Sequence, residues 1–300
     1  MGLARRERVL LAVLLLHVNR TVSATLITDA VWGDRPPADA SGQVHATVYR
    51  LRKGLAAAGV PDGLVVTDPA GYRLRVQPGS VDLVEFRELR DRAREAAASG
   101  DLDAATAGYR AALALWRGPA LDGLASDLLR RAAAGLDEER LQAVEECVEA
   151  ELSLGRGREL VAELTELVER HPHREGLHRA LMLALYRAGR QADALAAYRR
   201  ARQLLHDELG IEPGAELQQM QHAILNRDPA LLSPPQPVAA EPPQAVPREL
   251  PADVSGFTGR VEVLTALDEL LADTEDGALV PVVISAIAGT AGVGKPALGL

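Results

Sequence analysis

Aromatic residues are scarce in this 300-residue chain: they make up 3% of it, although 47% of the residues are hydrophobic. Any core must therefore be built from Leu, Ala and Val, and that mixture favours helices over sheets. The chain is long enough for two or three domains of ordinary size. The composition therefore indicates a mainly helical protein with more than one domain.

Cysteine and long hydrophobic runs are also nearly absent. Cys147 is the single cysteine, which excludes a disulfide within the chain and fits a reducing, cytoplasmic compartment. It lies in the helical pattern LQAVEECVEAEL, where a free cysteine is expected to be a small buried hydrophobe. No apolar run reaches the roughly 20 residues that a membrane-spanning helix needs, so we expect no membrane partner.

One apolar run, Val9 to Leu16, resembles an export signal because basic residues precede it and Val22-Ser23-Ala24 resembles a cleavage site. The alternative is the first helix of a folded domain. Glu7 interrupts the basic leader, and cleavage after Ala24 would split a helical unit that Ser23 caps. The run is therefore predicted to be a helix of a cytoplasmic protein.

The formal net charge is −9, which alone would argue against binding to nucleic acid. The charge is unevenly distributed, however. Residues 1–80 hold ten Arg or Lys against six Asp or Glu, a balance of +4, which leaves −13 on the remaining residues. A basic first segment joined to an acidic body indicates that only the first segment binds a polyanion.

The patterns along the chain predict four segments. Residues 1–78 should form a winged helix-turn-helix, and residues 80–228 a set of helical hairpins like tetratricopeptide repeats. Residues 229–255 read as an extended linker, because eight prolines lie between Pro229 and Pro251. Residues 256–300 read as the incomplete start of an α/β P-loop segment.

Three helices and a hairpin are predicted in the first segment. The helices should cover about Arg5–Val18, Ser23–Gly33 and Ala38–Ala58. In the third helix, one stripe at helical spacing is apolar and should be buried: Val44, Val48, Leu51 and Leu55. LVVTDPAGYRLRV has the pattern of a β-hairpin. A winged helix-turn-helix has its elements in this order: two helices, a third helix that is basic, and a hairpin.

The opposite side of the third helix is small, polar and cationic. It carries Gln43, Ala46, Thr47, Tyr49, Arg50 and Lys53. Such a face fits the major groove of DNA, where Arg and Gln pair with base edges and Lys with phosphate. A solvated basic face is the alternative for a lone helix, but the hairpin that follows favours DNA. Arg73 and Arg75 of the hairpin would then contact backbone phosphates.

Internal repeats are visible in residues 80–228. Gly100, Gly155 and Gly189 take equivalent positions, and the last two are separated by 34 residues, the tetratricopeptide period. We expect each glycine at a turn between two helices, where a side chain would crowd the pair. Nine residues after each glycine stands a residue expected to pack into the neighbouring hairpin: Tyr109, Leu164 and Tyr198. An insertion from Trp116 to Leu136 lengthens the first unit. Stacked hairpins offer a concave surface to another protein.

No catalytic constellation stands out, so the chain is not expected to be an enzyme. His171, His173 and His178 cluster around a helix break, but no cysteine or group of carboxylates accompanies them as metal ligands. They are expected to be surface histidines at a helix junction, and no metal site is predicted.

Near the end of the chain a glycine-rich loop follows the buried-strand pattern VPVVISAIA. Its residues Gly289, Gly292, Gly294 and Lys295 match a phosphate-binding loop, in which backbone N–H groups and the lysine hold phosphates. Pro296 stands where Ser or Thr would hold Mg²⁺, and the sequence stops at Leu300. The loop is therefore predicted to be a remnant or a truncated start, and ATP to bind only where a longer chain completes it.

The stretch ERVLLAVLLLHVNRTVSATLITDAVWGDRPPADASGQVHATVYRLRKGL, followed by VVTDPAGYRLRV, resembles the DNA-binding domain of the Streptomyces antibiotic regulatory protein family, which has the OmpR-type winged helix fold. LMLALYRAGRQADALAAYRRARQLLHDELGIEPGAELQQMQHAIL resembles the bacterial transcriptional activation domain of that family. The resemblance runs through residue 230. GFTGR and the P-loop resemble the start of the NB-ARC type ATPase module of larger members.

This resemblance implies an activator of antibiotic biosynthesis genes that binds promoter repeats in double-stranded DNA, contacts RNA polymerase and forms a homodimer. It places Gln43, Thr47, Tyr49, Arg50 and Lys53 on the recognition helix. Members begin with strands before the first helix, whereas this sequence starts at that helix, so we expect either a truncated start or a missing upstream sheet. Without the sheet, the first helix is expected to expose apolar surface. Two alternatives are a protein-interaction scaffold of tetratricopeptide type and a fragment of a nucleotide-switched regulatory ATPase.

Overall fold

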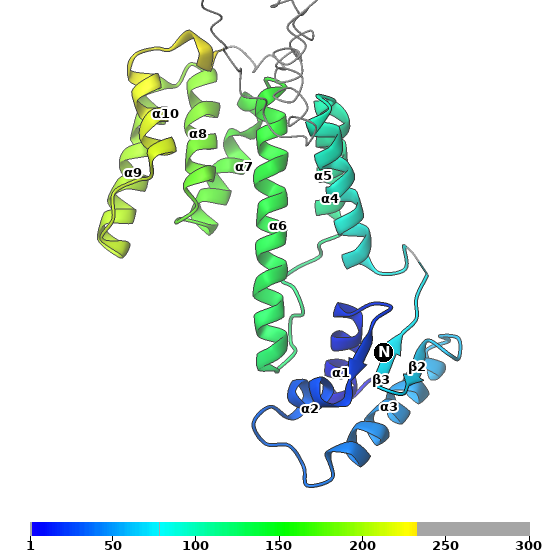
Figure 1. Ribbon diagram of the computed structural model, residues 1–300. Helices are drawn as coiled ribbons and strands as arrows, with labels where there is room; N and C mark the ends of the chain where they lie inside the picture. The colour runs from blue at the N-terminus through cyan, green and yellow to red at the C-terminus, as the bar shows by residue number, and fades with distance from the viewer. Residues whose placement is uncertain (1, 78, 233–300) are drawn as a thin grey trace, which may run out of the picture. The chain divides into compact units, whose positions relative to one another are not determined.

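The computed structural model describes residues 2–77 and 79–232. All of these residues belong to one compact unit, and Figure 1 draws them as the coloured ribbon. Its described residues form an N-terminal lobe, residues 2–77, and a helical lobe, residues 79–232. The P-loop residues Gly289 to Lys295 and most of the proline-rich segment lie outside the described residues.

The N-terminal lobe contains the three predicted helices and the predicted hairpin. In chain order its elements are α1 (Arg5–Leu16), β1 (Thr21–Ser23), α2 (Ala24–Trp32), α3 (Ala40–Ala57), β2 (Val65–Asp68) and β3 (Gly71–Leu74). The strands form an antiparallel sheet in the order β1-β3-β2. The predicted winged helix arrangement is confirmed, with β1 as an additional strand.

Local sequence explains where the helices begin. The Ser23 side chain accepts a hydrogen bond from the Leu26 N–H at 3.2 Å and caps α2. The Asp39 carboxylate accepts one from the Gly42 N–H at 2.9 Å and caps α3. These short polar side chains satisfy backbone donors that the first helical turn leaves free. The caps therefore fix the start of both helices of the helix-turn-helix.

Strand β1 has only three residues, too few for a recognisable sequence period. Its place in the sheet depends on contacts distant in sequence. Just before it, the Asn19 amide donates to the Val76 carbonyl oxygen and accepts from the Val76 N–H, at 3.2 and 3.0 Å. Asn19 therefore continues the sheet past the end of β3.

The helical lobe consists of consecutive helices. They are α4 (Asp82–Ala98), α5 (Leu102–Ala114), α6 (Asp127–Ser153), α7 (Gly157–Arg170), α8 (Glu175–Arg187), α9 (Gln191–Leu209) and α10 (Ala215–Leu225), followed by the short 3-10 helix η1 (Pro229–Leu231). Figure 1 shows that the connection between α5 and α6 is longer than the others. Helix α4 packs on α5, α7 on α8 and α8 on α9, which confirms the helical hairpins. None of the described helices is long and apolar enough to cross a membrane.

The repeated glycines lie at the expected turns, but for a different reason. Gly100, Gly155 and Gly189 have φ values of +85°, +79° and +78°, in the left-handed region that favours glycine. A Cβ atom added to any of them would meet no atom within 4 Å. The expectation that a side chain would crowd the helix pair is therefore wrong. Backbone conformation, and not lack of space, selects glycine there.

The residues that follow these glycines by nine positions are buried, as predicted. Tyr109 packs with Cys147, whereas Leu164 and Tyr198 belong to the large core that the helices from α6 to α10 share. Cys147 is buried, and burial raises the pKa of its thiol to about 12. The thiol therefore stays protonated at neutral pH, in agreement with the predicted role of Cys147 as a small buried hydrophobe.

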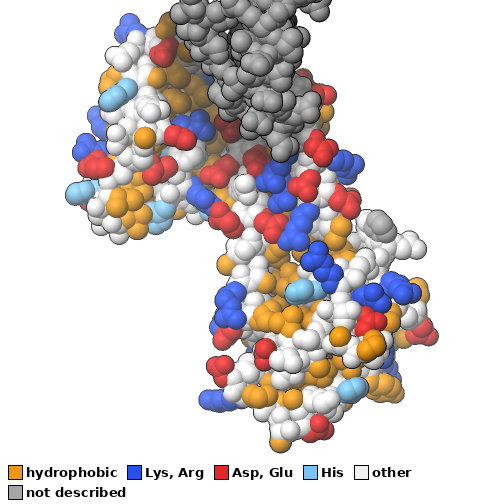
Figure 2. Space-filling view, viewed as in Figure 1, with side chains coloured by type: hydrophobic (Ala, Val, Ile, Leu, Met, Phe, Trp, Pro, Cys, Tyr) orange, Lys and Arg blue, Asp and Glu red, His pale blue; other side chains and the backbone are white. Residues whose placement is uncertain are grey.

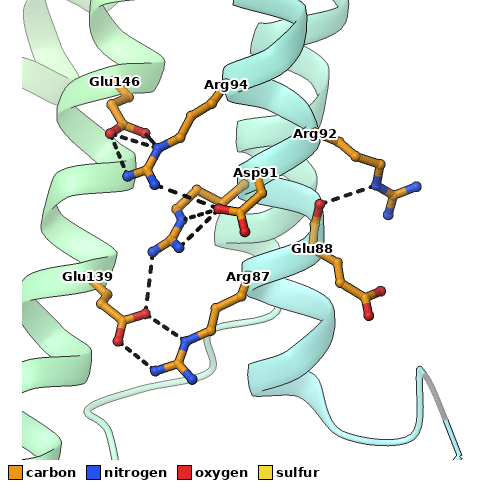
Figure 3. A network of polar contacts seen from close by, with 8 residues as sticks. Arg87, Glu88, Asp91, Arg92, Arg94, Glu139 and Glu146 are labelled. Carbon is orange, nitrogen blue, oxygen red and sulfur yellow. Dashed lines mark hydrogen bonds and ion pairs between the residues drawn. The ribbon is translucent and has the colours of Figure 1, made fainter.

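A ladder of ion pairs joins α4 to α6 (Figure 3). The Arg87 guanidinium lies 2.6 Å from the Glu139 carboxylate, and the Arg94 guanidinium lies 2.7 Å from the Glu146 carboxylate. Partners on each helix are seven residues apart, or two turns, so they share one face. Figure 2 shows the resulting band of blue and red side chains. Such half-exposed pairs stabilise only modestly, and their main effect is to set the register of α4 along α6.

The apolar surface of α1 is largely covered, contrary to expectation. Leu10, Val13 and Leu14 are fully buried. Part of the cover comes from the helical lobe, because Leu129 of α6 is buried in the core of the N-terminal lobe. Partly buried leucines of the α5–α6 connection and the first turn of α6 pack against the same core: Leu121, Leu124 and Leu128.

Two hydrogen bonds hold this contact between the lobes. The Ser126 hydroxyl donates to the Ala30 carbonyl oxygen of α2 at 2.7 Å, in a buried position. The Arg5 guanidinium donates to the Ala125 carbonyl oxygen at 2.9 Å. The insertion between α5 and α6 thus attaches the helical lobe to the first two helices of the N-terminal lobe.

The three histidines do not form a metal site. Within residues 2–77 and 79–232, no group of three or more His, Cys, Asp or Glu is placed to hold a metal ion. The prediction of surface histidines is wrong for His178, which is buried and donates from Nε2 to the Pro172 carbonyl oxygen at 2.8 Å. This bond ties α8 to the turn that precedes it.

We predict that His178 makes stability depend on pH. Burial lowers the pKa of His178 below its ordinary value of 6.5, so the unfolded chain binds the proton more readily than the folded chain. Its contribution to stability is then complete above pH 6.5 and is lost as the pH falls below that value. Between about pH 7.5 and 5.5, thermal melts of His178→Gln should lose less stability than wild type. The exposed His222→Gln serves as control, and an unchanged pH dependence in His178→Gln would contradict the prediction.

Candidate nucleic-acid interface

Helix α3 separates an apolar stripe from a polar face. Four side chains at helical spacing are buried as predicted: Val44, Val48, Leu51 and Leu55. Gln43, Tyr49 and Lys53 are exposed on the other side, and 67% of the Tyr49 surface is accessible. No described residue pairs with the Lys53 ammonium, so its charge is available to a ligand.

Thr47 does not belong to this exposed face. Its relative exposure is 0%, and its hydroxyl donates to the Gln43 carbonyl oxygen at 2.8 Å. The prediction placed Thr47 on the exposed face of α3, and this placement is wrong because the residue is buried. The residue lies about 70° from the centre of the buried stripe at 100° per residue, so the buried side of α3 is wider than its apolar residues indicate.

Arg50 lies at the edge of the polar face, on the side of α1. Its Nε donates to a Glu7 carboxylate oxygen at 2.7 Å, and its Nη2 donates to the Thr47 hydroxyl at 3.2 Å. Glu7 was not predicted as part of the site. The only signal in the sequence is a single acidic residue among the arginines that begin α1, and it does not identify the partner.

Arg52 is a second residue that sequence reasoning missed. Its guanidinium donates to the Val65 carbonyl oxygen and to the Thr67 hydroxyl, both in β2, at 2.8 and 2.9 Å. About two helical turns earlier, His45 meets the buried ring of Tyr72 edge-on, with the ring centroids 6.0 Å apart. These contacts fix the orientation of the wing relative to α3.

The two arginines of the wing differ in their surroundings. Arg73 is half-buried and its guanidinium lies 3.1 Å from the Asp68 carboxylate, which also accepts from the Thr21 hydroxyl at 2.6 Å. Arg75 is exposed, and its backbone N–H continues the ladder by donating to the Leu64 carbonyl oxygen at 2.8 Å. Arg75 has no ion-pair partner among residues 2–77 and 79–232, whereas Arg73 is held within the sheet by Asp68.

The structure thus brings together a face of Gln43, Tyr49, Lys53 and the edge residue Arg50, with Arg75 on the wing. The face provides donors that suit base edges, an aromatic ring and cations for phosphates. The chemistry of these side chains therefore suits a polyanionic ligand.

Two family models match the chain. Residues 1–74 match the family described as "Transcriptional regulatory protein, C terminal", and residues 81–225 match "Bacterial transcriptional activator domain". The first match covers the winged helix elements, and the second covers α4 to α10. The two lobes therefore correspond to two known modules in the order expected of a transcriptional regulator.

Curated relatives extend this likeness. The regulatory protein AfsR of Streptomyces coelicolor is 40% identical over 299 residues, which is 98% of this chain and 30% of AfsR. The regulatory protein DnrI of Streptomyces peucetius is 38% identical over 236 residues, 76% of this chain and 87% of DnrI. The chain thus spans less than a third of the length of AfsR but most of the length of DnrI.

A solved structure has the same fold. Mycobacterium tuberculosis EmbR, in complex with a low affinity phosphopeptide, superimposes with a TM-score of 0.73 and 37% sequence identity. The likeness covers 76% of this chain and 61% of the EmbR chain. The arrangement of a winged helix followed by helical hairpins is therefore shared with a transcriptional regulatory protein.

Proposed function

This chain belongs to the Streptomyces antibiotic regulatory protein family of DNA-binding transcriptional regulators, and from that premise we propose that α3 and the wing read promoter DNA. The observation that carries the proposal is the exposed polar face of α3, which presents Gln43, Tyr49 and a Lys53 that has no ion-pair partner among the described residues. The chain then acts as an activator of antibiotic biosynthesis genes and binds repeated promoter sites.

Each residue of the face has a role that follows from its chemistry. Lys53 and Arg75 neutralise backbone phosphates, which fixes the register of the protein on the duplex. Gln43 presents an amide that pairs with an adenine edge, and the Tyr49 ring packs against a thymine methyl group. Arg73 supports the wing through Asp68 and contacts phosphate less directly than Arg75.

The helical lobe supplies the protein contacts in this proposal. Its stacked hairpins present a surface to RNA polymerase and to a second copy of the chain, as the family relation supports. Because the lobe is anchored to α2 through Ser126, a partner bound to the helical lobe is held close to the promoter.

The test begins with a binding site selected from a random library of duplexes about 20 base pairs long, with a shuffled duplex of equal composition as reference. Fluorescence anisotropy at several salt concentrations then gives the affinity and its salt slope. Each lost phosphate contact should reduce the slope of log K against log salt by about 0.9. We therefore expect Lys53→Ala and Arg75→Ala each to weaken binding to both duplexes and to lower the slope.

Arg158→Ala is the matched control, because Arg158 is an exposed cation of α7 in the helical lobe. It removes the same charge and should leave the slope unchanged. Equal slopes for all three variants, or selection of no preferred duplex by the wild-type protein, would refute the assigned face.

A further inference from the structure

Glu7 is an acidic side chain buried beside the DNA-reading face. Its side chain is 4% exposed, and one carboxylate oxygen accepts from Arg50 Nε at 2.7 Å. The other oxygen is also buried and has no hydrogen-bond partner among the described residues. Burying a carboxylate is costly, and one incompletely satisfied ion pair is a poor source of stability. The pair therefore calls for a role other than holding α1 to α3.

Arg50 is held at two points. The Glu7 carboxylate accepts a hydrogen bond from Nε, and the Thr47 hydroxyl accepts one from Nη2 at 3.2 Å. The same hydroxyl donates to a backbone carbonyl oxygen of α3. A guanidinium has five N–H donors in a rigid plane, so these two bonds fix its orientation and leave further donors for a ligand. Because the Arg50 side chain is 47% exposed, a ligand in front of α3 can reach them.

Glu7 also changes the electrostatic character of Arg50. A carboxylate at 2.7 Å offsets most of the field that the guanidinium would present to a distant phosphate. Lys53, by contrast, has no ion-pair partner among the described residues. The two cations on this face therefore differ. Lys53 attracts the phosphate backbone of any DNA sequence. The charge of Arg50 is nearly cancelled at long range, and its guanidinium is held in one orientation.

We propose that Glu7 is a positioning residue that determines DNA specificity, because it orients Arg50 and offsets its charge so that Arg50 reads a base edge instead of binding phosphates indiscriminately. The ligand group is the acceptor pair of a guanine in the major groove, which suits an oriented guanidinium. This inference rests on the proposed DNA-binding role of α3. It assigns a function in recognition to a residue of α1, outside the helix-turn-helix.

The discriminating variant is Glu7→Gln, which keeps the shape and the oxygen that accepts from Arg50 but removes the charge. Freed from its counter-charge, Arg50 should then pair with phosphate, so the salt slope should become steeper by about 0.9. The preference for the selected duplex over the shuffled duplex should fall by about tenfold or more, the discrimination that a bidentate arginine provides. Binding to the shuffled duplex should tighten.

Asp29→Asn is the matched control, since Asp29 is an exposed carboxylate of α2 and its loss changes the net charge equally. It should leave the preference between duplexes unchanged. In the double variant Glu7→Gln with Arg50→Ala, preference and slope should equal those of Arg50→Ala alone, because Glu7 acts through Arg50. If Glu7 had only a structural role, Glu7→Gln would lower the melting temperature and weaken binding to both duplexes by the same factor. It would do so both in the wild-type protein and in Arg50→Ala.

Arg50→Lys provides a second route if Glu7→Gln does not fold, as circular dichroism melts would show. It keeps the charge but loses Nε and the planar fork, so preference should fall while affinity for the shuffled duplex is kept. A preference unchanged in Arg50→Lys, or additive effects of Glu7→Gln and Arg50→Ala, overturns the inference. A wild-type protein without any preferred duplex would instead refute the proposed function itself.

Discussion

Gly71→Ala is expected to break the pairing of β1 with β3 and to destabilise the N-terminal lobe by about 3 kcal/mol or more, a loss at the large end for one substitution. Gly71 has a φ of +151°, and an added Cβ would lie 2.0 Å from the Val22 carbonyl oxygen. That oxygen belongs to the backbone of β1 and cannot move without loss of the strand pairing. DNA binding should fall with it, since the wing carries Arg75.

Gly63→Ala is the control for Gly71→Ala. Gly63 also has a positive φ, +89°, but an added Cβ would meet nothing within 4 Å. The free energy of unfolding of Gly63→Ala should fall only by the strain of a left-handed residue, about 1 kcal/mol. Urea denaturation followed by Trp32 fluorescence, in a Trp116→Phe background, reports the N-terminal lobe because Trp32 lies in α2. Equal losses for the two variants would show that the close approach of β1 does not matter.

Leu129→Ala should destabilise the N-terminal lobe by about 3 kcal/mol, although Leu129 belongs to the helical lobe. The side chain is 1% exposed and packs in the core that α1, α2 and α3 share. Its truncation would leave a cavity at the junction between α6 and α2, where the Ser126 hydroxyl is bonded to the Ala30 carbonyl oxygen. The unfolding transition reported by Trp32 fluorescence should therefore shift to a lower urea concentration.

Leu128→Ala removes the same atoms from a neighbouring, half-buried position and should cost clearly less. Both variants should also be tested for affinity to the selected duplex. If Leu129→Ala leaves the transition reported by Trp32 unchanged, the helical lobe does not contribute to the core of the N-terminal lobe as we infer.

Much of the fold was predictable because its causes are local. Ser23 marks the start of α2 through a bond to a backbone N–H three residues away. The apolar stripe of α3, from Val44 to Leu55, follows from helical spacing alone. The repeat glycines mark turns because a left-handed backbone selects glycine, even though the crowding first expected of them is absent.

The errors and omissions at the candidate site have a common cause. Thr47 was expected on the exposed face, yet it is buried because neighbouring helices cover more of α3 than its apolar residues mark. Arg73 is predicted from the sequence to contact phosphate, but its guanidinium is paired with Asp68 of β2, and the contacts of Arg52 with β2 are not visible in the sequence at all. Each assignment depends on which element packs beside the residue, and helical or strand spacing does not contain that information.

The helices, the hairpin and the repeat period can be predicted from the sequence, because caps, turns and periodicity act over a few residues. The contact of Glu7 with Arg50 and the place of Leu129 in the core covering α1 follow only from how the helices pack. Both contacts join residues far apart in the chain. Their formation depends on how whole helices pack, which burial of apolar surface drives without regard to sequence order.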